Sequence, residues 1–192
     1  MKDINNFRNK IVCGDSIELL QKIPNDSIDL IITSPPYFQQ RYYGGFDNEI
    51  GGEKDVQDYI DNLLKIFGEC VRIIKDSGNI VFNIGDKYDE SNLLLVPFRF
   101  AIETTKKYPV KLVNEITWVK LNPTPRQFRK RLVSSTEPFF HFVKSNDYHF
   151  NLEEYLNFPK LARLKKNGNG NGIGKKYFEL IDKSELTKEE KN

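Results

Sequence analysis

Four consecutive residues, Ser34-Pro35-Pro36-Tyr37, combine groups that could hold an amino group on a planar ring. They follow the apolar stretch 27–33, and the two prolines cannot continue a central strand because they have no N–H to donate. A rigid carbonyl and the serine hydroxyl can accept hydrogen bonds from an exocyclic amine, while the tyrosine ring offers a flat surface for stacking. A nucleobase carries such an amine on a planar ring, and a base in a duplex must leave the duplex to be reached.

Two other predicted strands also end in polar residues, Gly14-Asp15 and the stretch from Asn83 to Asp86. Ligands of open α/β sheets bind beyond the carboxyl ends of the strands, so these ends could face one site. Asp15 has a second interpretation, as the N-cap of the next helix. Asn83 and Asp86 could equally be turn-forming residues.

Predicted strands and predicted helices, which must position these residues, alternate along the chain. This alternation is typical of an α/β fold with a mostly parallel sheet. An antiparallel part is expected near 110–150, with 147–152 as a strand extension. The residues Asp76-Ser77-Gly78 are expected to end the longest helix. The predicted strands are 10–15, 27–33, 79–86, 110–120 and 138–145, and the predicted helices are 16–23, 56–75 and 94–106.

Composition narrows the class of protein. The chain has 192 residues, 39% hydrophobic and 29% charged, with a formal net charge of +2, which indicates a soluble globular protein and is too mild to imply nucleic acid by itself. Cys13 and Cys70 are expected to be buried reduced thiols, and with His141 and His149 they form no zinc-binding spacing. No signal peptide or membrane-spanning stretch is seen, so a cytoplasmic location without membrane contact is expected.

A basic cluster interrupts the pattern between the last two predicted strands. It comprises Arg126, Arg129, Lys130 and Arg131. A charge run of this kind is either a solvated face or a phosphate-contacting segment. Further on, the Gly/Asn/Lys-rich stretch around 165–175 has the composition of a flexible linker.

The stretch "DSIDLIITSPPY" resembles the catalytic motif of the amino-group DNA methyltransferases that use S-adenosylmethionine. The resemblance extends in one order through "CVRIIKDSGNIVFNIGD", "NEITWVKLNPTPRQFRKRLVSSTEPFFHFVKS" and "KSELT". This order, with the catalytic motif before the donor-binding motif, is the beta arrangement. It implies a Rossmann-like methyltransferase fold, S-adenosylmethionine as cofactor, and double-stranded DNA with a flipped base as partner.

The resemblance also implies a role for each motif position. Ser34 and the Pro35 carbonyl would bind the target amine, within the catalytic set of Ser34, Pro35, Pro36 and Tyr37, with Tyr37 stacking on the base. Cofactor contacts would come from Gly14, Asp15 and Thr33, base-pocket contacts from Asn83 and Asp86, and DNA contacts from Arg126, Arg129, Lys130 and Arg131. Glu137 and Pro138 would shape the pocket wall. We expect Trp118 to be a core residue, and neither histidine to have a partner or a catalytic role.

Serine before Pro-Pro-Tyr is the form usual for methylation of cytosine N4, in a restriction–modification system. Asp or Asn is more usual for adenine N6, which remains the alternative, as does an inactive DNA-binding relic. Related motifs in enzymes that methylate RNA or protein glutamine are disfavoured by "NPTPRQFRKR".

The sequence departs from the family in one motif, since it contains no Phe-x-Gly-x-Gly turn for the methionine part of the cofactor. We therefore expect a partial catalytic domain at 1–150, incomplete toward the C-terminus, and the start of a target-recognition or linker region at 151–192. Three explanations fit the missing motif: a split gene whose second polypeptide carries the glycine-rich half, an interrupted gene, or a truncation. An incomplete sheet predicts an exposed strand edge, apolar helix faces and weak or no donor binding by this chain alone.

Overall fold

The computed structural model describes residues 3–42, 44, 49–121 and 130–157. The chain divides into two units, Met1–His149 and Phe150–Asn192. Helix α4 (Leu152–Asn157) belongs to the second unit, and all the other helices and strands belong to the first.

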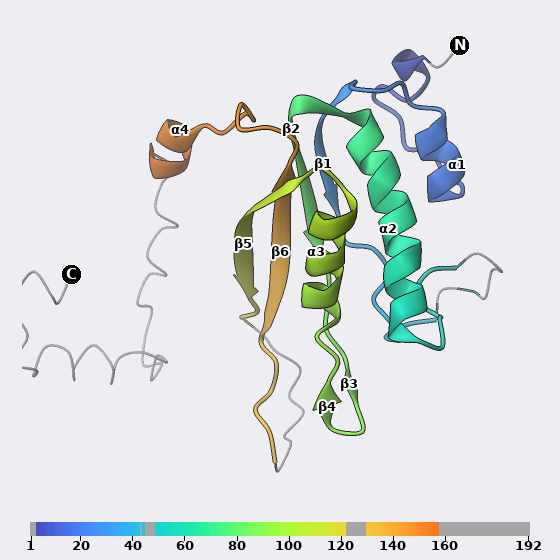
Figure 1. Cartoon of the computed structure of the whole chain (residues 1–192), viewed down its shortest axis with the longest axis vertical. Helices are drawn as coiled ribbons and strands as arrows, with labels where there is room; N and C mark the ends of the chain where they lie inside the picture. The colour runs from blue at the N-terminus through green and yellow to red at the C-terminus, as the bar shows by residue number, and fades with distance from the viewer. Residues whose placement is uncertain (1–2, 43, 45–48, 122–129, 158–192) are drawn as a thin grey trace, which may run out of the picture. The chain divides into compact units, whose positions relative to one another are not determined.

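The first unit is built on a four-stranded sheet (Figure 1). Its strands are, in spatial order, β1 (Ile28–Thr33), β2 (Ile74–Asn83), β6 (Thr136–Val143) and β5 (Lys111–Val119). β1 and β2 are parallel, with α2 in the connection that returns the chain between them, whereas β5 and β6 pair antiparallel. β6 is also antiparallel to β2, so this sheet is mixed. The Rossmann-like α/β class and the antiparallel part are confirmed.

Helices cover one face of the sheet. α2 (Val56–Ile73) and α3 (Val96–Lys107) pack on it, and α1 (Ser16–Gln21) packs against α2. Along α2, the buried residues recur with the 3.6-residue period of an amphipathic helix, which confirms the helix predicted here: Tyr59, Ile60, Leu63, Leu64, Phe67, Cys70 and Val71. Opposite them, alternate sheet residues Ile80, Phe82, Phe140 and Phe142 complete the core.

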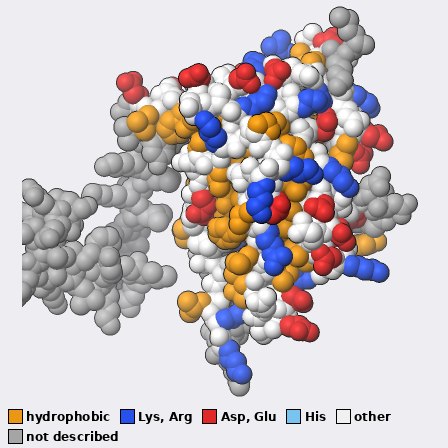
Figure 2. All heavy atoms as spheres, viewed as in Figure 1, with side chains coloured by type: hydrophobic (Ala, Val, Ile, Leu, Met, Phe, Trp, Pro, Cys, Tyr) orange, Lys and Arg blue, Asp and Glu red, His pale blue; other side chains and the backbone are white. Residues whose placement is uncertain are grey.

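The outer side of this helical layer is not wholly polar. Figure 2 shows hydrophobic side chains, with lysine and arginine among them, around the position of α3. Phe98 and Ile102 on this helix are each about half exposed. The expectation of apolar surface on the helices is therefore confirmed for α3.

The other face of the sheet carries exposed apolar side chains in the described part of the chain. Leu30 and Ile32 on β1, and Ile116 and Trp118 on β5, are at least half exposed. β1 is also an edge strand of this sheet. The prediction that Trp118 is a core residue is wrong, because it lies on the face that α2 and α3 do not cover.

The predicted strand 10–15 does not form. Ile11 is fully exposed and no ladder pairs this stretch in the described structure, and an extended segment without a partner is not stable as a strand. For the same reason Cys13 is exposed, so the prediction of a buried thiol is wrong there. Cys70 is buried as predicted, and burial raises the pKa of its thiol to about 12.

The end of the longest helix also differs from the prediction. α2 stops at Ile73, and β2 begins at the next residue instead of after a turn at 76–78. The three residues form an irregularity inside β2, where the register shifts between the pairs Ile28–Ile74 and Leu30–Asn79. Gly78 packs so closely that a Cβ there would lie 2.7 Å from Ile74 Cγ1.

Two local features, one after β2 and one after β6, differ from the prediction. A short hairpin, β3 (Tyr88–Asp89) with β4 (Asn92–Leu93), turns through Glu90 and Ser91, which both have positive φ angles. The expected strand extension at 147–152 is irregular up to Asn151. Ser145 Oγ accepts from the Asp147 N–H and Asn151 Oδ1 accepts from the Glu154 N–H, and such local hydrogen bonds compete with a ladder.

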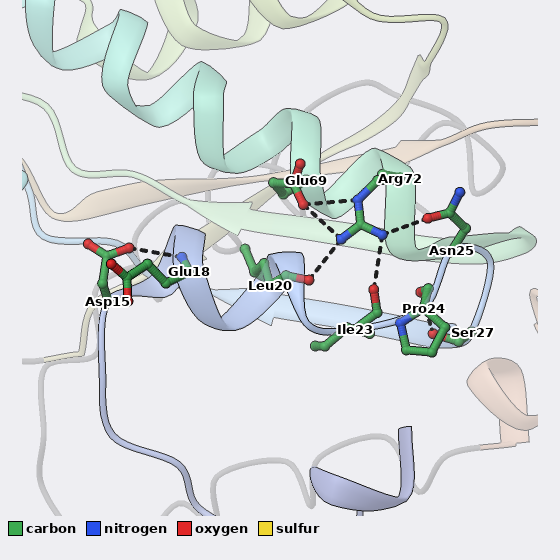
Figure 3. A network of polar contacts seen from close by, with 9 residues as sticks. All are labelled: Asp15, Glu18, Leu20, Ile23, Pro24, Asn25, Ser27, Glu69 and Arg72. Carbon is green, nitrogen blue, oxygen red and sulfur yellow. Dashed lines mark hydrogen bonds and ion pairs between the residues drawn. The ribbon is translucent and has the colours of Figure 1, made fainter. Parts of the chain in front are cut away.

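Arg72 ties the end of α1 to α2 (Figure 3). Its guanidinium donates to the carbonyls of Leu20 and Ile23 at 2.8 and 3.0 Å, to Asn25 Oδ1 at 2.6 Å, and to Glu69. A planar fork with five donors can reach all of these acceptors at once, and a lysine cannot.

We therefore expect Arg72→Met to lower the free energy of unfolding by about 2–3 kcal/mol, because it leaves partly buried carbonyls without donors. Arg72→Lys should recover little of this loss. Urea denaturation measures both, with Lys65→Met as the control, since Lys65 is an exposed cation on the same helix. Equal losses in Arg72→Met and Lys65→Met would contradict the assigned role.

His141 on β6 is buried between two asparagines, so the expectation that it has no partner is wrong. Its Nε2 lies 2.7 Å from Asn79 Oδ1, and Asn114 Nδ2 lies 3.1 Å from its Nδ1. Asn79 Nδ2 donates to the His149 carbonyl, which orients that amide. The ring is therefore neutral with its proton on Nε2, and burial lowers the pKa of His141.

Stability should consequently fall as the pH drops. A histidine in the unfolded chain titrates near 6.5, so between that value and the lowered folded pKa the unfolded state binds more protons. We expect urea midpoints to decrease from about pH 7 to about pH 5, and His141→Gln to reduce this dependence. His149→Gln, the same change at the chain's other histidine, should leave it in place. An unchanged pH dependence in His141→Gln would rule out this explanation.

Candidate active site

The site begins where β1 and β2 end together. Thr33, the last residue of β1, pairs with Phe82, and the next residues are Ser34 and Asn83. Parallel neighbouring strands present their carboxyl ends at one edge, which is where open α/β sheets bind ligands. Ser34 Oγ lies 3.3 Å from Asn83 Oδ1. The two residues are thus brought together although 49 positions separate them.

The Tyr37 hydroxyl lies at the centre of this cluster. Its oxygen is 2.6 Å from Asn83 Oδ1, 2.9 Å from Glu137 Oε2 and 3.2 Å from Ser34 Oγ. The Tyr37 ring lies against Gly85, where a Cβ would come within 2.4 and 2.5 Å of two ring carbons. Only a glycine at this position allows the ring to lie as it does.

Glu137 enters the cluster from β6. Its other carboxylate oxygen pairs with the Lys120 ammonium, just beyond β5, and its side chain is only 12% exposed. The neighbouring Pro138 carbonyl accepts from Asn83 Nδ2 at 3.0 Å, which turns Asn83 Oδ1 toward Ser34 and Tyr37. The site therefore gathers acceptor oxygens from three strand ends, and acceptors of this kind suit an amino group.

A side chain of α2 fixes the proline turn through a hydrogen bond. Tyr59, which is fully buried, donates from its hydroxyl to the Pro36 carbonyl at 2.8 Å. The loop that follows is closed by Gln39 N–H, which donates to the Gly51 carbonyl. Gly51 has φ +101°, and a Cβ there would lie 3.1 Å from the Tyr37 carbonyl oxygen. These contacts fix the direction of the backbone through Pro36 and Tyr37.

Asp86 takes part in a different set of contacts. Its Oδ1 accepts from Lys87 N–H at 2.8 Å and from the N–H of Val96, the first residue of α3, at 3.0 Å. Its carbonyl accepts from Gln40. These contacts are those of a turn-forming residue, which is one of the two roles expected for Asp86. They also place the loop after Tyr37 beside the start of α3.

Asp15 is the N-cap of α1, which is the second of the two roles that the sequence allowed for it. Asp15 Oδ1 accepts from the N–H groups of Ile17 and Glu18 at 2.9 and 3.0 Å, and Gly14 lies against Leu19. The exposed carboxylate keeps Oδ2 as a possible acceptor for the hydroxyl or amino groups of an adenosine. The contacts described for Gly14 and Asp15 are those of a helix start, and the sequence contains no Phe-x-Gly-x-Gly turn for the methionine part of S-adenosylmethionine.

Part of the basic cluster can be placed. Lys130 is exposed, and the Arg131 guanidinium lies 3.7 Å from the centroid of the Tyr88 ring, a cation–π contact with the β3–β4 hairpin. Arg126 and Arg129 lie outside the described residues. The contact brings Arg131 beside a hairpin that starts three residues after Gly85.

Glu137 was singled out from the sequence, but neither Lys120 nor Tyr59 was. Lys120 and Glu137 meet because β5 and β6 pair antiparallel, a register that the sequence does not display. Tyr59 lies on the buried face of α2, and a tyrosine there needs a partner for its hydroxyl, which is a signal that the sequence offers.

The described residues contain no group of three or more His, Cys, Asp or Glu side chains arranged to hold a metal ion. In the same part of the chain, no helix has the length and apolar character needed to cross a membrane.

Comparison with known proteins identifies the family. Residues 28–192 match the DNA methylase family, which covers the Ser34-Pro35-Pro36-Tyr37 turn and every other strand end of the site. The chain therefore belongs to this family of amino-group methyltransferases. The cofactor of the family is S-adenosylmethionine.

Curated relatives agree with this assignment. The chain is 37% identical over 158 residues to the type II methyltransferase M.SfiI of Streptomyces fimbriatus, covering 73% of this chain and 37% of that protein. It is 39% identical over 144 residues to M.MwoI of Methanothermobacter wolfeii, covering 73% and 21%. It is 32% identical over 191 residues to M.SmaI of Serratia marcescens, covering 82% and 64%. The chain thus spans about a fifth to just under two thirds of these relatives.

Solved structures share the fold. The PvuII DNA methyltransferase (cytosine-N4-specific) superposes with a TM-score of 0.63 at 22% identity, over 88% of this chain and 61% of that one. A putative DNA modification methylase from Thermus thermophilus, in complex with S-adenosyl-L-methionine, gives 0.55 at 22% identity, over 77% and 58%. These likenesses confirm the methyltransferase fold of the described domain.

Proposed function

We propose that this chain is the catalytic part of a DNA methyltransferase that transfers a methyl group from S-adenosylmethionine to the N4 amino group of cytosine. The observation that carries the proposal is the cluster of acceptor oxygens around Ser34, Tyr37 and Asn83 at the end of parallel strands, next to the rigid Pro-Pro turn. An exocyclic amine has two N–H donors, and such a cluster accepts them.

In the proposed reaction, Ser34 Oγ and the Pro35 carbonyl accept hydrogen bonds from the target amine and direct its lone pair at the donor methyl. The cofactor supplies the methyl group on a sulfonium sulfur. The nitrogen forms a bond to the methyl carbon while the carbon–sulfur bond breaks, with no covalent bond to the protein. Tyr37 stacks on the base, Asn83 and Asp86 border its pocket, and orientation supplies much of the rate.

Several features support the finer assignments. Serine before Pro-Pro-Tyr favours cytosine N4 over adenine N6, and one structural neighbour bears the description cytosine-N4-specific. The relatives are named type II methyltransferases, which supports a restriction–modification role in the cytoplasm. Lys130 and Arg131, with Arg126 and Arg129, would contact the phosphates of double-stranded DNA from which the target base is flipped. Gly14, Asp15 and Thr33 would contact the cofactor.

The donor-binding half is proposed to come from chain outside these 192 residues, such as a second polypeptide. The sequence lacks a Phe-x-Gly-x-Gly turn, β1 is an edge strand, and apolar side chains on the sheet face beside it are exposed. On this proposal, residues 1–150 form the partial catalytic domain and 151–192 begin a target-recognition or linker region.

The test is methyl transfer from labelled S-adenosylmethionine to mixed-sequence DNA, with the labelled nucleoside identified. We assay the chain alone and co-expressed with a polypeptide that carries the glycine-rich half. N4-methylcytosine in the second preparation supports the whole proposal, and in the first it overturns the need for a second half. N6-methyladenine overturns the choice of base. No label in either preparation, with salt-sensitive DNA binding retained, identifies a non-catalytic relic.

A further inference from the structure

The hydroxyl of Tyr37 has more acceptors around it than it has hydrogens. Asn83 Oδ1 at 2.6 Å and Glu137 Oε2 at 2.9 Å are both acceptor atoms, and the phenol has one hydrogen for the two. Asn83 cannot be reversed to supply a donor, because its Nδ2 already donates to the Pro138 carbonyl. Ser34, at 3.2 Å, can donate to the Tyr37 oxygen but cannot place a hydrogen between Tyr37 and Glu137.

When the Tyr37 hydrogen lies toward Asn83, the contact between Glu137 Oε2 and Tyr37 Oη has no hydrogen and can accommodate one. With a hydrogen there, Glu137 would donate to Tyr37, and Tyr37 would donate its own hydrogen to Asn83 across the shorter contact. With Ser34 donating to Tyr37, each of the three contacts given above for the Tyr37 hydroxyl would then hold one hydrogen. The Lys120 ammonium already occupies the other carboxylate oxygen, so it does not fill this position.

The proposed reaction releases one proton, and the contact between Tyr37 Oη and Glu137 Oε2 has room for one. We propose that Glu137 takes up the amine proton released by methyl transfer, through the hydroxyls of Ser34 and Tyr37. The inference rests on the proposed function. It assigns to Glu137 a positioning role that acts through Tyr37, in addition to the residues of the Pro-Pro-Tyr turn.

The steps balance. The amine lone pair forms the nitrogen–carbon bond, and the electrons of the carbon–sulfur bond return to sulfur, which becomes a neutral thioether. The nitrogen gives its proton to Ser34 Oγ as Ser34 passes its hydrogen to Tyr37 Oη, and Tyr37 passes its hydrogen to Glu137 Oε2. Glu137, at 12% exposure, then returns the proton to water.

The variant Glu137→Gln separates this role from a structural one. A glutamine can keep an oxygen toward Lys120 and place an N–H toward Tyr37, which supplies the missing hydrogen but accepts no proton. We expect its thermal midpoint to equal or exceed that of the wild type, while the single-turnover transfer rate falls about 100-fold, as for loss of a proton-accepting group. The KM for DNA should be nearly unchanged. Glu115→Gln, the same change at an exposed position on β5, is the control for both measurements.

Tyr37→Phe interrupts the same path, so its rate loss and that of Glu137→Gln should not multiply in the double variant. The rates are measured in whichever preparation transfers methyl groups, and the midpoints on the chain alone. A thermal midpoint of Glu137→Gln as low as that of Glu137→Ala, or a transfer rate within twofold of wild type, would overturn the inference while leaving the proposed function in place. A wild-type protein inactive in both preparations would refute the proposed function, and the proton path with it.

Discussion

Gly85→Ala is expected to lower the methyl-transfer rate at least about 100-fold, because a displacement of about 1 Å in a positioning group has effects of this size. The added Cβ would lie 2.4 Å from Tyr37 Cδ2 and 2.5 Å from Cε2, so the ring cannot stay where it is. When the ring moves, the hydroxyl leaves its partners Asn83 and Glu137. The fold should persist, since the strand ladder of β2 ends at Asn83.

The matched control is Gly52→Ala, because a Cβ at Gly52 meets nothing within 4 Å. Single-turnover transfer rates and the thermal midpoints of both variants make the comparison. A Gly85→Ala protein that transfers methyl groups at the wild-type rate would show that the position of the Tyr37 ring is unimportant to the reaction.

Phe67→Ala should cause the largest loss of stability, about 3–5 kcal/mol in the free energy of unfolding. Phe67 is fully buried on α2, and its ring lies 5.0–5.8 Å from the ring centroids of four other aromatic residues. These are Phe82, Phe100, Tyr108 and Phe142, from β2, α3, the end of α3 and β6. Truncation leaves a cavity where the helices meet the sheet.

Phe98→Ala provides the comparison, since Phe98 is about half exposed and has one described ring contact, with Phe140. Urea denaturation of both variants should show a loss for Phe98→Ala that is a small part of the loss for Phe67→Ala. Similar losses would mean that the aromatic cluster is not the centre of the core.

The sequence predicts the elements whose patterns are local. The period of α2, the apolar run of β1 and the turn at Ser34-Pro35-Pro36-Tyr37 each follow from neighbouring residues, and the structure confirms these elements. The pairing of Ser34 with Asn83 was also predictable in outline, since adjacent parallel strands end at one edge.

What could not be predicted depends on register and on partners. Glu137 reaches Tyr37 across 100 positions because β6 inserts between β2 and β5, and no local pattern reports this. The stretch 10–15 has strand-like residues but no paired strand in the described structure, and a ladder needs both sides. Trp118 was assigned to the core from its residue type, whereas its exposure follows from which face of the sheet the helices cover.

The most direct test of the central claim, that Ser34 lies at the reacting amine, is the single-turnover methyl-transfer rate of Ser34→Ala in the preparation that is active. The account predicts a rate about 100-fold or more below wild type, with the affinity for DNA unchanged. Ser77→Ala, at an exposed serine on β2, should match the wild type. A Ser34→Ala protein that transfers methyl groups within twofold of the wild-type rate would contradict the account.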